Sequence, residues 1–230
     1  DPIVRRREEK ALQARFASLV KGGGEETEEG FRPDPRLEGL YRALAQALVH
    51  SPEVNVARGR AIVDKKLGDI AVDLREHGAA YRLLSEAEAS VQSPLFATLP
   101  ASGQKALLLV YFYGLEEYLH SRLRGLVPAG ATILLGERGH ISSRRRGWEA
   151  QWASLTLGNL LYALGHNPHL FVAEKERWGN EAEPLLRQAV EARNRTAHPS
   201  REAPPLDRVR DLVYGAIPVM EAVLKWPKAS

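Results

Sequence analysis

Apolar residues recur every three or four positions along most of the chain, which is the spacing of helices that bury one face. In the second half this pattern predicts helices over residues 103–126, 147–164, 180–198 and 207–225. In the first half it predicts helices over 4–20, 37–50 and 56–92, the last one bent or divided at Gly78. No alternating pattern of useful length predicts a strand in the first half. The chain is therefore expected to be all-α.

Breaks in the helical pattern suggest how the chain is organised. Three glycines at 22–24 and an acidic stretch up to Gly30 predict a flexible linker after the first helix. We expect a first region at 1–36, a helical N-terminal region at 37–100 and a helical bundle at 101–230. The predicted architecture is an up-and-down bundle with an N-terminal helical extension.

The predicted helix at 180–198 has well-defined ends. Asn180 is a capping residue, and Pro184 is tolerated in a first turn. Leu186, Val190, Arg193 and Ala197 continue at helical spacing, so Arg193 extends the apolar stripe instead of lying on the solvated face. Pro199 disfavours helical geometry in the residue before it, which predicts that the helix ends at His198.

The composition of the chain bears on its core, its cellular compartment and its contact with nucleic acid. The chain has 230 residues, 44% of them hydrophobic, which is enough for a real core. It contains no cysteine, no run of about 18 apolar residues and no charged-then-apolar leader, so we expect a cytoplasmic protein without a membrane span. The net charge of +3 is well short of that of a protein that coats nucleic acid. Any contact with RNA must therefore be local.

The candidate chemistry lies in the segment Arg193-Asn194-Arg195-Thr196-Ala197-His198. An arginine holds the charge of a phosphate with fixed donors, and a histidine moves protons near neutral pH, so together they suit cleavage of RNA without a metal. Of the seven histidines, only His198 has an arginine five to seven positions before it. The alternative is structural: helix-end electrostatics together with a hydrogen bond to a backbone carbonyl.

The stretch "EARNRTAHP" resembles the mark of the HEPN family, all-helical proteins that carry arginine, a polar residue and, a few positions later, histidine late in the fold. The resemblance covers about residues 100–226, including "SLTLGNLLYAL" and the predicted helix through Glu116 and Glu117. It implies a metal-independent endoribonuclease that acts on single-stranded RNA in defence, toxin-antitoxin or stress-response systems. It also implies a homodimer, whose two copies form one composite cleft with Arg193 and His198 as the catalytic pair.

Five residues at 3.6 per turn place the two side chains roughly 140 degrees apart on an ideal helix, so either the helix unwinds at Pro199 or the site is shared by two chains. Around the pair we expect Asn194 to orient the site or to cap the helix locally. Glu116 and Glu117 either hold the arginine or histidine or are simply solvated. Arg195 binds phosphate or is a solvated arginine, and the run at 144–146 either tracks an RNA backbone or is an ordinary surface loop. The candidate RNA-binding residues are thus Arg195, Arg144, Arg145 and Arg146.

Other chemistries have weaker signals. His166 and His169 are not followed by a carboxylate cluster, so we predict no metal site and no cofactor. No glycine-rich phosphate loop precedes a Lys-Ser or Lys-Thr pair, which excludes a P-loop nucleotidase. Two alternatives to the nuclease remain. One is a non-catalytic helical module that binds RNA or a protein partner, and the other is a subunit or fragment of a larger assembly with a separate sensor.

Overall fold

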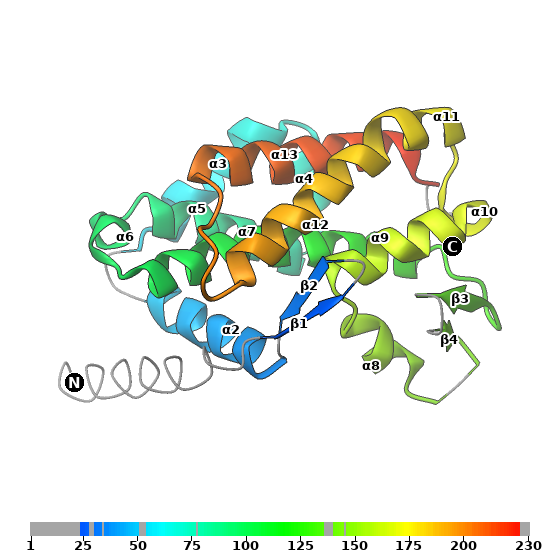
Figure 1. Cartoon of the computed structure of the whole chain (residues 1–230). Coiled ribbons are helices and arrows are strands. Elements are labelled where there is room, and N and C mark those ends of the chain that lie inside the picture. The colour runs from blue at the N-terminus through cyan, green and yellow to red at the C-terminus, as the bar shows by residue number, and fades with distance from the viewer. Residues whose placement is uncertain are drawn as a thin grey trace.

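Helix α7 (Ala101–Arg124) forms the centre of the fold. The computed structural model of the chain describes residues 24–27, 30–33, 35–50, 54–76, 78–135, 140–144 and 146–225. Because apolar residues lie on all sides of α7, the helix requires cover all round. That cover comes from α2 (Pro35–Val49), α5 (Gly78–Val91), α12 (Glu183–Ala197) and α13 (Leu206–Val223) (Figure 1). The fold is an all-α helical bundle, which confirms the predicted class.

The residues before α7 form a hairpin and a set of helices. Strands β1 (Gly24–Thr27) and β2 (Gly30–Pro33) pair in antiparallel fashion. The hairpin overlaps the stretch predicted as a linker, whose composition does not reveal that two short segments pair along their backbones. The helix predicted over 4–20 lies outside the described residues.

The predicted helical stretch at 56–92 divides twice. Helix α3 (Val56–Leu67) ends at Gly68, whose positive φ of 54° suits glycine, and α4 (Ile70–Glu76) follows. The expected break at Gly78 is confirmed, since α5 begins there, and the short α6 (Pro94–Thr98) then leads to α7. Gly59 lets α3 approach α5 closely, because a Cβ there would lie 2.0 Å from the backbone oxygen of Ser85.

The helices on both sides of residue 100 share a single hydrophobic core. Leu37 and Tyr41 on α2 are fully buried, as are Tyr111 on α7 and Ile217 on α13. Gly114 on α7 lies directly against Leu84 on α5, where a Cβ would approach the leucine side chain to 2.7 Å. The N-terminal region described from residue 37 thus packs onto the bundle as part of the same core.

The second half differs from prediction in two connections. The helix predicted over 147–164 is two helices, α8 (Trp148–Ala153) and α9 (Leu157–His166), because Thr156 and Asn159 form a capping box that starts a new helix. The loop before α8 contains a short hairpin of β3 (Thr132–Leu134) and β4 (His140–Ser142). The segment after α9 contains α10 (Pro168–Phe171) and α11 (Lys175–Arg177).

The start of α12 also differs from prediction. Asn180 does not cap the helix; it lies inside a π-helical turn, η2 (Trp178–Ala182), that continues directly into α12. Pro184 has no N–H, and its ring crowds the carbonyl four residues earlier, so a wider turn relieves the clash. The predicted end of the helix is confirmed: α12 ends at Ala197, and His198 is extended with φ −72° and ψ 125°.

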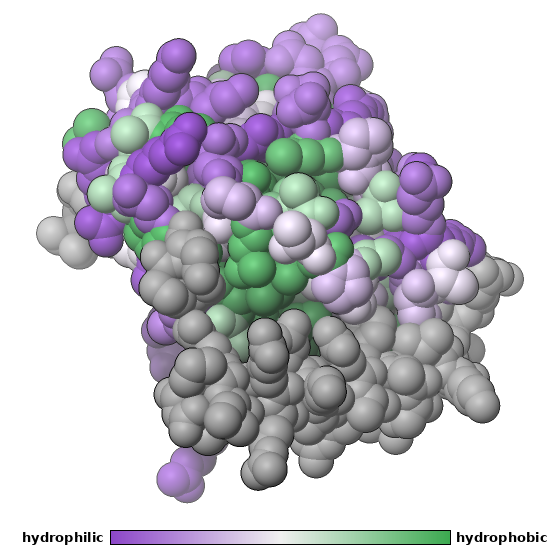
Figure 2. Space-filling view, turned by 90° about the vertical axis from the view of Figure 1, so that its left-hand side faces the viewer, coloured by the Kyte–Doolittle hydropathy of each residue, from purple (hydrophilic) through white to green (hydrophobic). Residues whose placement is uncertain are grey.

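One end of the bundle joins α6, the start of α7 and the connection from α12 to α13, at the left of Figure 1. Figure 2 shows this end, where hydrophobic side chains form a band below a hydrophilic region. Among the described residues, no helix is long and apolar enough to cross a bilayer. The same residues hold no group of three or more histidine, aspartate or glutamate side chains placed to bind a metal ion.

Candidate functional site at the end of helix α12

Arg193 lies on the inward face of α12. Its neighbours on that face are small or polar, Ala189, Ala192, Thr196 and Ala197, and they are buried with it. The arginine is only 2% exposed, which confirms its predicted place on the inward stripe. A charged group at such a position requires partners inside the protein.

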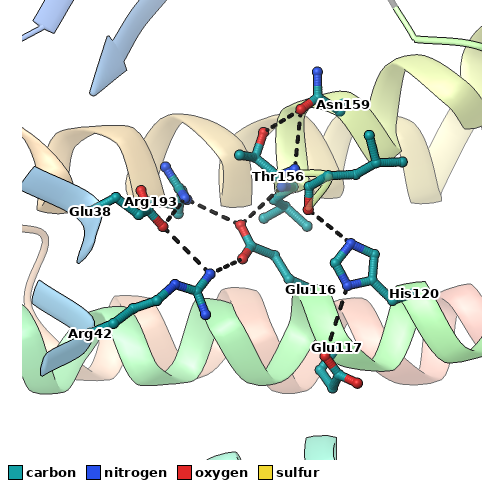
Figure 3. Close-up of polar contacts among 10 residues, drawn as sticks. Glu38, Arg42, Glu116, Glu117, His120, Thr156, Asn159 and Arg193 are labelled. Atoms are coloured by element: carbon teal, nitrogen blue, oxygen red, sulfur yellow. Dashed lines mark hydrogen bonds and ion pairs between the residues drawn. The ribbon is translucent and has the colours of Figure 1, made fainter. Parts of the chain in front are cut away.

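Two carboxylates supply these partners (Figure 3). Arg193 donates from Nε to Oε1 of Glu116 on α7 at 3.2 Å, and from Nη2 to Oε1 of Glu38 on α2 at 2.6 Å. Nη2 of Arg42 on α2 lies 3.5 Å from Oε2 of Glu116 and 3.6 Å from Oε1 of Glu38, so a second arginine contacts both carboxylates. We call Glu38, Arg42, Glu116 and Arg193 the Arg193 cluster. Two positive and two negative charges make it neutral overall.

Glu116 connects three helices at once. The same Oε1 atom that accepts from Arg193 also accepts from the backbone N–H of Leu157 at 2.9 Å. Leu157 is the first residue of α9, so the carboxylate occupies one of the free donors there and complements the positive end of the helix dipole. The position of α12 is therefore linked through Glu116 to the start of α9.

The electrostatics keep Arg193 charged. Burial opposes the charge, but Glu116 and Glu38 outweigh it, so the pKa of Arg193 lies above its ordinary value. Tyr113 lies beside the cluster, with the Arg42 guanidinium 3.8 Å from the centre of its ring. Burial raises the pKa of this phenol well above its ordinary value. Neither group changes charge near neutral pH.

His198 lies just beyond the last turn of α12 and is half-buried. Its backbone N–H donates to the Asn194 carbonyl at 3.0 Å, and its ring Nδ1 accepts from the backbone N–H of Ser200 at 3.2 Å. Because an amide N–H can only donate, Nδ1 is the acceptor, and the neutral ring carries its proton on Nε2. The Ser200 hydroxyl lies 3.2 Å from the same nitrogen.

The two predicted catalytic residues face different surroundings. The bonded atoms of Arg193 face α2 and α7, whereas the Nδ1 of His198 faces Ser200 in the connection to α13. The structure brings Arg193 together with Glu116, which matches the expectation that Glu116 holds the arginine. Among the described residues it shows no hydrogen bond between Arg193 and His198.

Glu117 and Asn194 have other surroundings. Glu117 lies 3.9 Å from Nδ1 of His120, and its interaction with this ring lowers the pKa of the carboxyl. The other ring nitrogen of His120 lies 2.8 Å from the Leu155 carbonyl oxygen. Figure 3 shows this pair extending away from Arg193, so Glu117 does not hold the predicted catalytic residues. Asn194 is half-buried, and its carbonyl takes part in the end of α12.

The candidate RNA-binding arginines are not gathered at one place. Arg195 is exposed on α12, beside the predicted pair. Arg144 and Arg146 are exposed after β4, at the right of Figure 1, whereas the end of α12 lies toward the left. Arg145 lies outside the described residues. The structure thus leaves Arg195 near His198 and separates the described arginines at 144 and 146 from it.

Sequence reasoning missed three residues of this region. Glu38 and Arg42 are an i,i+4 charged pair next to buried Leu37 and Tyr41, which is a weak signal because most such pairs are exposed. Lys105 is 8% exposed and contacts the backbone after α12. Its signal was a lysine inside the apolar pattern of the helix at 103–126.

Comparisons of the chain with protein-family models, with curated proteins and with solved structures found no match. The resemblance to HEPN proteins therefore depends on the residues of the α12 segment and on the helices around them, and it stays a prediction.

Proposed function

We propose that this protein is a metal-independent endoribonuclease of the HEPN type, which cuts single-stranded RNA at a site shared by two copies of the chain. The observation that carries the proposal is the arrangement at the end of α12. Arg193 is fixed inside by Glu116, and His198 follows the helix with its ring oriented by Ser200. Cytoplasmic defence, toxin-antitoxin or stress-response systems are the setting that the resemblance implies.

The chemistry needs no metal if the RNA supplies its own nucleophile. The 2'-hydroxyl oxygen bonds to the adjacent phosphorus, the bond from phosphorus to the 5'-oxygen breaks, and a cyclic phosphate and a free 5'-hydroxyl result. One proton leaves the 2'-hydroxyl and one reaches the leaving oxygen. A histidine from each copy would serve one of these transfers, with Nε2 of His198 as the exchanging atom, since Nδ1 accepts from Ser200.

The role of Arg193 in this proposal follows from its partners. The Glu116 side chain is 5% exposed and anchors the guanidinium, whereas the Glu38 side chain is 17% exposed and lies nearer to solvent. A phosphate oxygen would therefore reach Nη2 only by replacing the Glu38 carboxylate. Charge-assisted hydrogen bonds to a phosphate are of the same kind as those to a carboxylate, so the exchange is chemically conservative. Arg195, exposed next to the site, is the other candidate for a phosphate contact.

A second candidate function is a non-catalytic helical module that binds RNA or a protein partner. The observation that favours it is the neutrality of the Arg193 cluster, where two carboxylates already occupy Nε and Nη2 of the arginine. In that case the arginine joins α2, α7 and α12, and His198 serves only to end the helix.

The experiment that separates the two functions relies on His198. Labelled single-stranded RNA is incubated in EDTA with wild type, His198→Gln and His166→Gln. His166 is the control, because it is an exposed histidine at the end of another helix, α9, with its Nδ1 3.1 Å from the Tyr162 carbonyl oxygen. The nuclease proposal expects cleavage by wild type and by His166→Gln, with a cyclic phosphate end, and loss of cleavage in His198→Gln.

Arg193→Ala is the poorer first variant, because it removes the buried cation that Glu116 and Glu38 share, so a loss of activity could reflect unfolding. Wild type that leaves RNA intact, or His198→Gln that cuts as well as wild type, would remove the nuclease proposal and leave the non-catalytic module.

A further inference from the structure

Lys105 holds the backbone that follows α12. Its ammonium Nζ lies 2.8 Å from the His198 carbonyl oxygen, 3.2 Å from that of Pro199 and 2.5 Å from that of Arg201. An ammonium carries three N–H donors, and three acceptors surround it here. We call residues 198–201 the His198 loop. The lysine lies 93 positions before His198 in the chain, on the second turn of α7.

These contacts differ from an ordinary surface ion pair. Lys105 is 8% exposed, and its three hydrogen bonds all go to backbone carbonyls of the His198 loop. These carbonyls follow Ala197, the last residue of α12, so they accept no hydrogen bond within that helix, and the ammonium donates to them. Burial lowers the pKa of Lys105, because the ammonium loses hydration inside the protein. The lysine therefore stabilises one particular path of the loop.

The Pro199 contact bears directly on the ring of His198. The carbonyl of Pro199 and the N–H of Ser200 belong to the same peptide plane, and the described peptide bonds are all trans. In a trans peptide these two groups point in opposite directions. When Lys105 holds the Pro199 oxygen on one side, the Ser200 N–H must point to the other side, where it donates to Nδ1 of His198.

We propose that Lys105 is a positioning residue. Its hydrogen bonds to the carbonyls of the His198 loop direct the Ser200 N–H onto Nδ1 of His198, and this contact keeps the ring proton on Nε2. For catalysis this inference rests on the proposed nuclease function, because it sets which nitrogen of His198 exchanges a proton with RNA. As a statement about the ring, it holds whether or not the protein cuts RNA.

The test measures which nitrogen of the His198 ring carries the proton. Nitrogen NMR of ¹⁵N-histidine protein, at a pH where the ring is neutral, distinguishes a proton on Nε2 from one on Nδ1, and His198→Gln assigns the signal. Wild type should show the Nε2–H form. In Lys105→Met, which removes the donors and keeps an unbranched side chain one atom shorter, we expect a mixture of the two forms.

Two variants at Ser200 make the test independent of how well Lys105→Met folds. Ser200→Pro removes the backbone N–H and should give the same mixture, whereas Ser200→Ala keeps that N–H and should retain the wild-type form. If the ring of folded Lys105→Met keeps its proton on Nε2 as in wild type, or if Ser200→Pro leaves the ring unchanged, Lys105 does not set the ring and the proposal fails.

Activity gives the second readout. If wild type cuts RNA, Lys105→Met should lower kcat by about tenfold to a hundredfold with little change in KM, since a displaced proton-transfer group slows the chemical step more than binding. A lowered kcat with an unchanged ring signal overturns the assigned route through Ser200. Wild type without any cleavage overturns the nuclease function, while the NMR comparison still decides the role of Lys105.

Discussion

Arg193 on α12 and Glu116 on α7 form an ion pair inside the protein, with 3.2 Å between Nε and Oε1, although 77 positions separate them in the chain. The arginine is 2% exposed and the glutamate 3% exposed. A buried pair of this kind is strongly unfavourable to break, because the remaining charge loses its partner without gaining water. The pair therefore links a residue expected to act on RNA to the stability of the fold.

Stability should fall sharply when this pair is broken from either side. We expect Arg193→Met and Glu116→Gln each to lower the free energy of unfolding, Arg193→Met by about 3–5 kcal/mol. The double variant should lose less than the sum of the single variants, because neither partner is then left charged and alone. Denaturant unfolding of the four proteins measures the coupling. Additive losses would show that the pair is not coupled.

Arg42→Ala is the control within the same cluster. Its side chain is 50% exposed and lies 3.5 Å from Glu116, so solvent screens the interaction. We expect a loss of at most about 1 kcal/mol in the same unfolding measurement. A loss as large as that of Arg193→Met would mean that Arg42 contributes as much as Arg193 to the stability of the cluster.

Glu38→Gln should raise the rate of RNA cleavage, if the nuclease proposal holds. Glu38 occupies Nη2 of Arg193 at 2.6 Å, so removing its charge leaves that donor more available to a phosphate. If the nuclease proposal holds, cleavage at limiting RNA should rise by up to about tenfold, the equivalent of ~1.4 kcal/mol. Glu86→Gln is the control for the loss of a negative charge. In the described structure the Glu86 side chain pairs only with its helix neighbour Arg82. Equal rates in Glu38→Gln and wild type would contradict the exchange of carboxylate for phosphate.

Acid stability should depend on Glu117. The His120 ring, 3.9 Å away, lowers the pKa of this carboxyl below its ordinary value of 4.5. A lowered folded-state pKa contributes stability that is present above the unfolded pKa and is lost as the pH falls through the folded pKa. Melting temperatures between pH 6 and pH 3 should therefore fall less steeply for Glu117→Gln than for wild type. Parallel curves would show that the contact with His120 contributes nothing.

The assembly prediction concerns the composite site. Because the bonded atoms of Arg193 and His198 face different elements in one chain, a shared site needs two copies. Sedimentation should then give twice the mass of 25.5 kDa for the active protein. A strictly monomeric protein that still cuts RNA would contradict the dimer and require both residues to act within one chain.

Local rules account for what could be predicted from the sequence. Hydrophobic spacing placed α2 and α13 to within a few residues and put Arg193 on the inward face, because the period of an α-helix fixes which positions share a side. Pro199 ended α12 at the right residue through the steric restriction on the residue before proline. The same rules missed the division between α8 and α9, where a capping box outweighed continuous apolar spacing.

The sequence by itself thus determined an all-α chain with an arginine turned inward and a histidine at the end of the same helix. Only the tertiary structure decided what those residues meet. Glu38 lies 155 positions from Arg193, and Lys105 lies 93 positions from His198. Periodicity states which face of a helix is buried but not which helix covers it, since that depends on how segments distant in the chain pack together. The contacts that fix the charge of Arg193 and the orientation of the His198 ring therefore follow from packing.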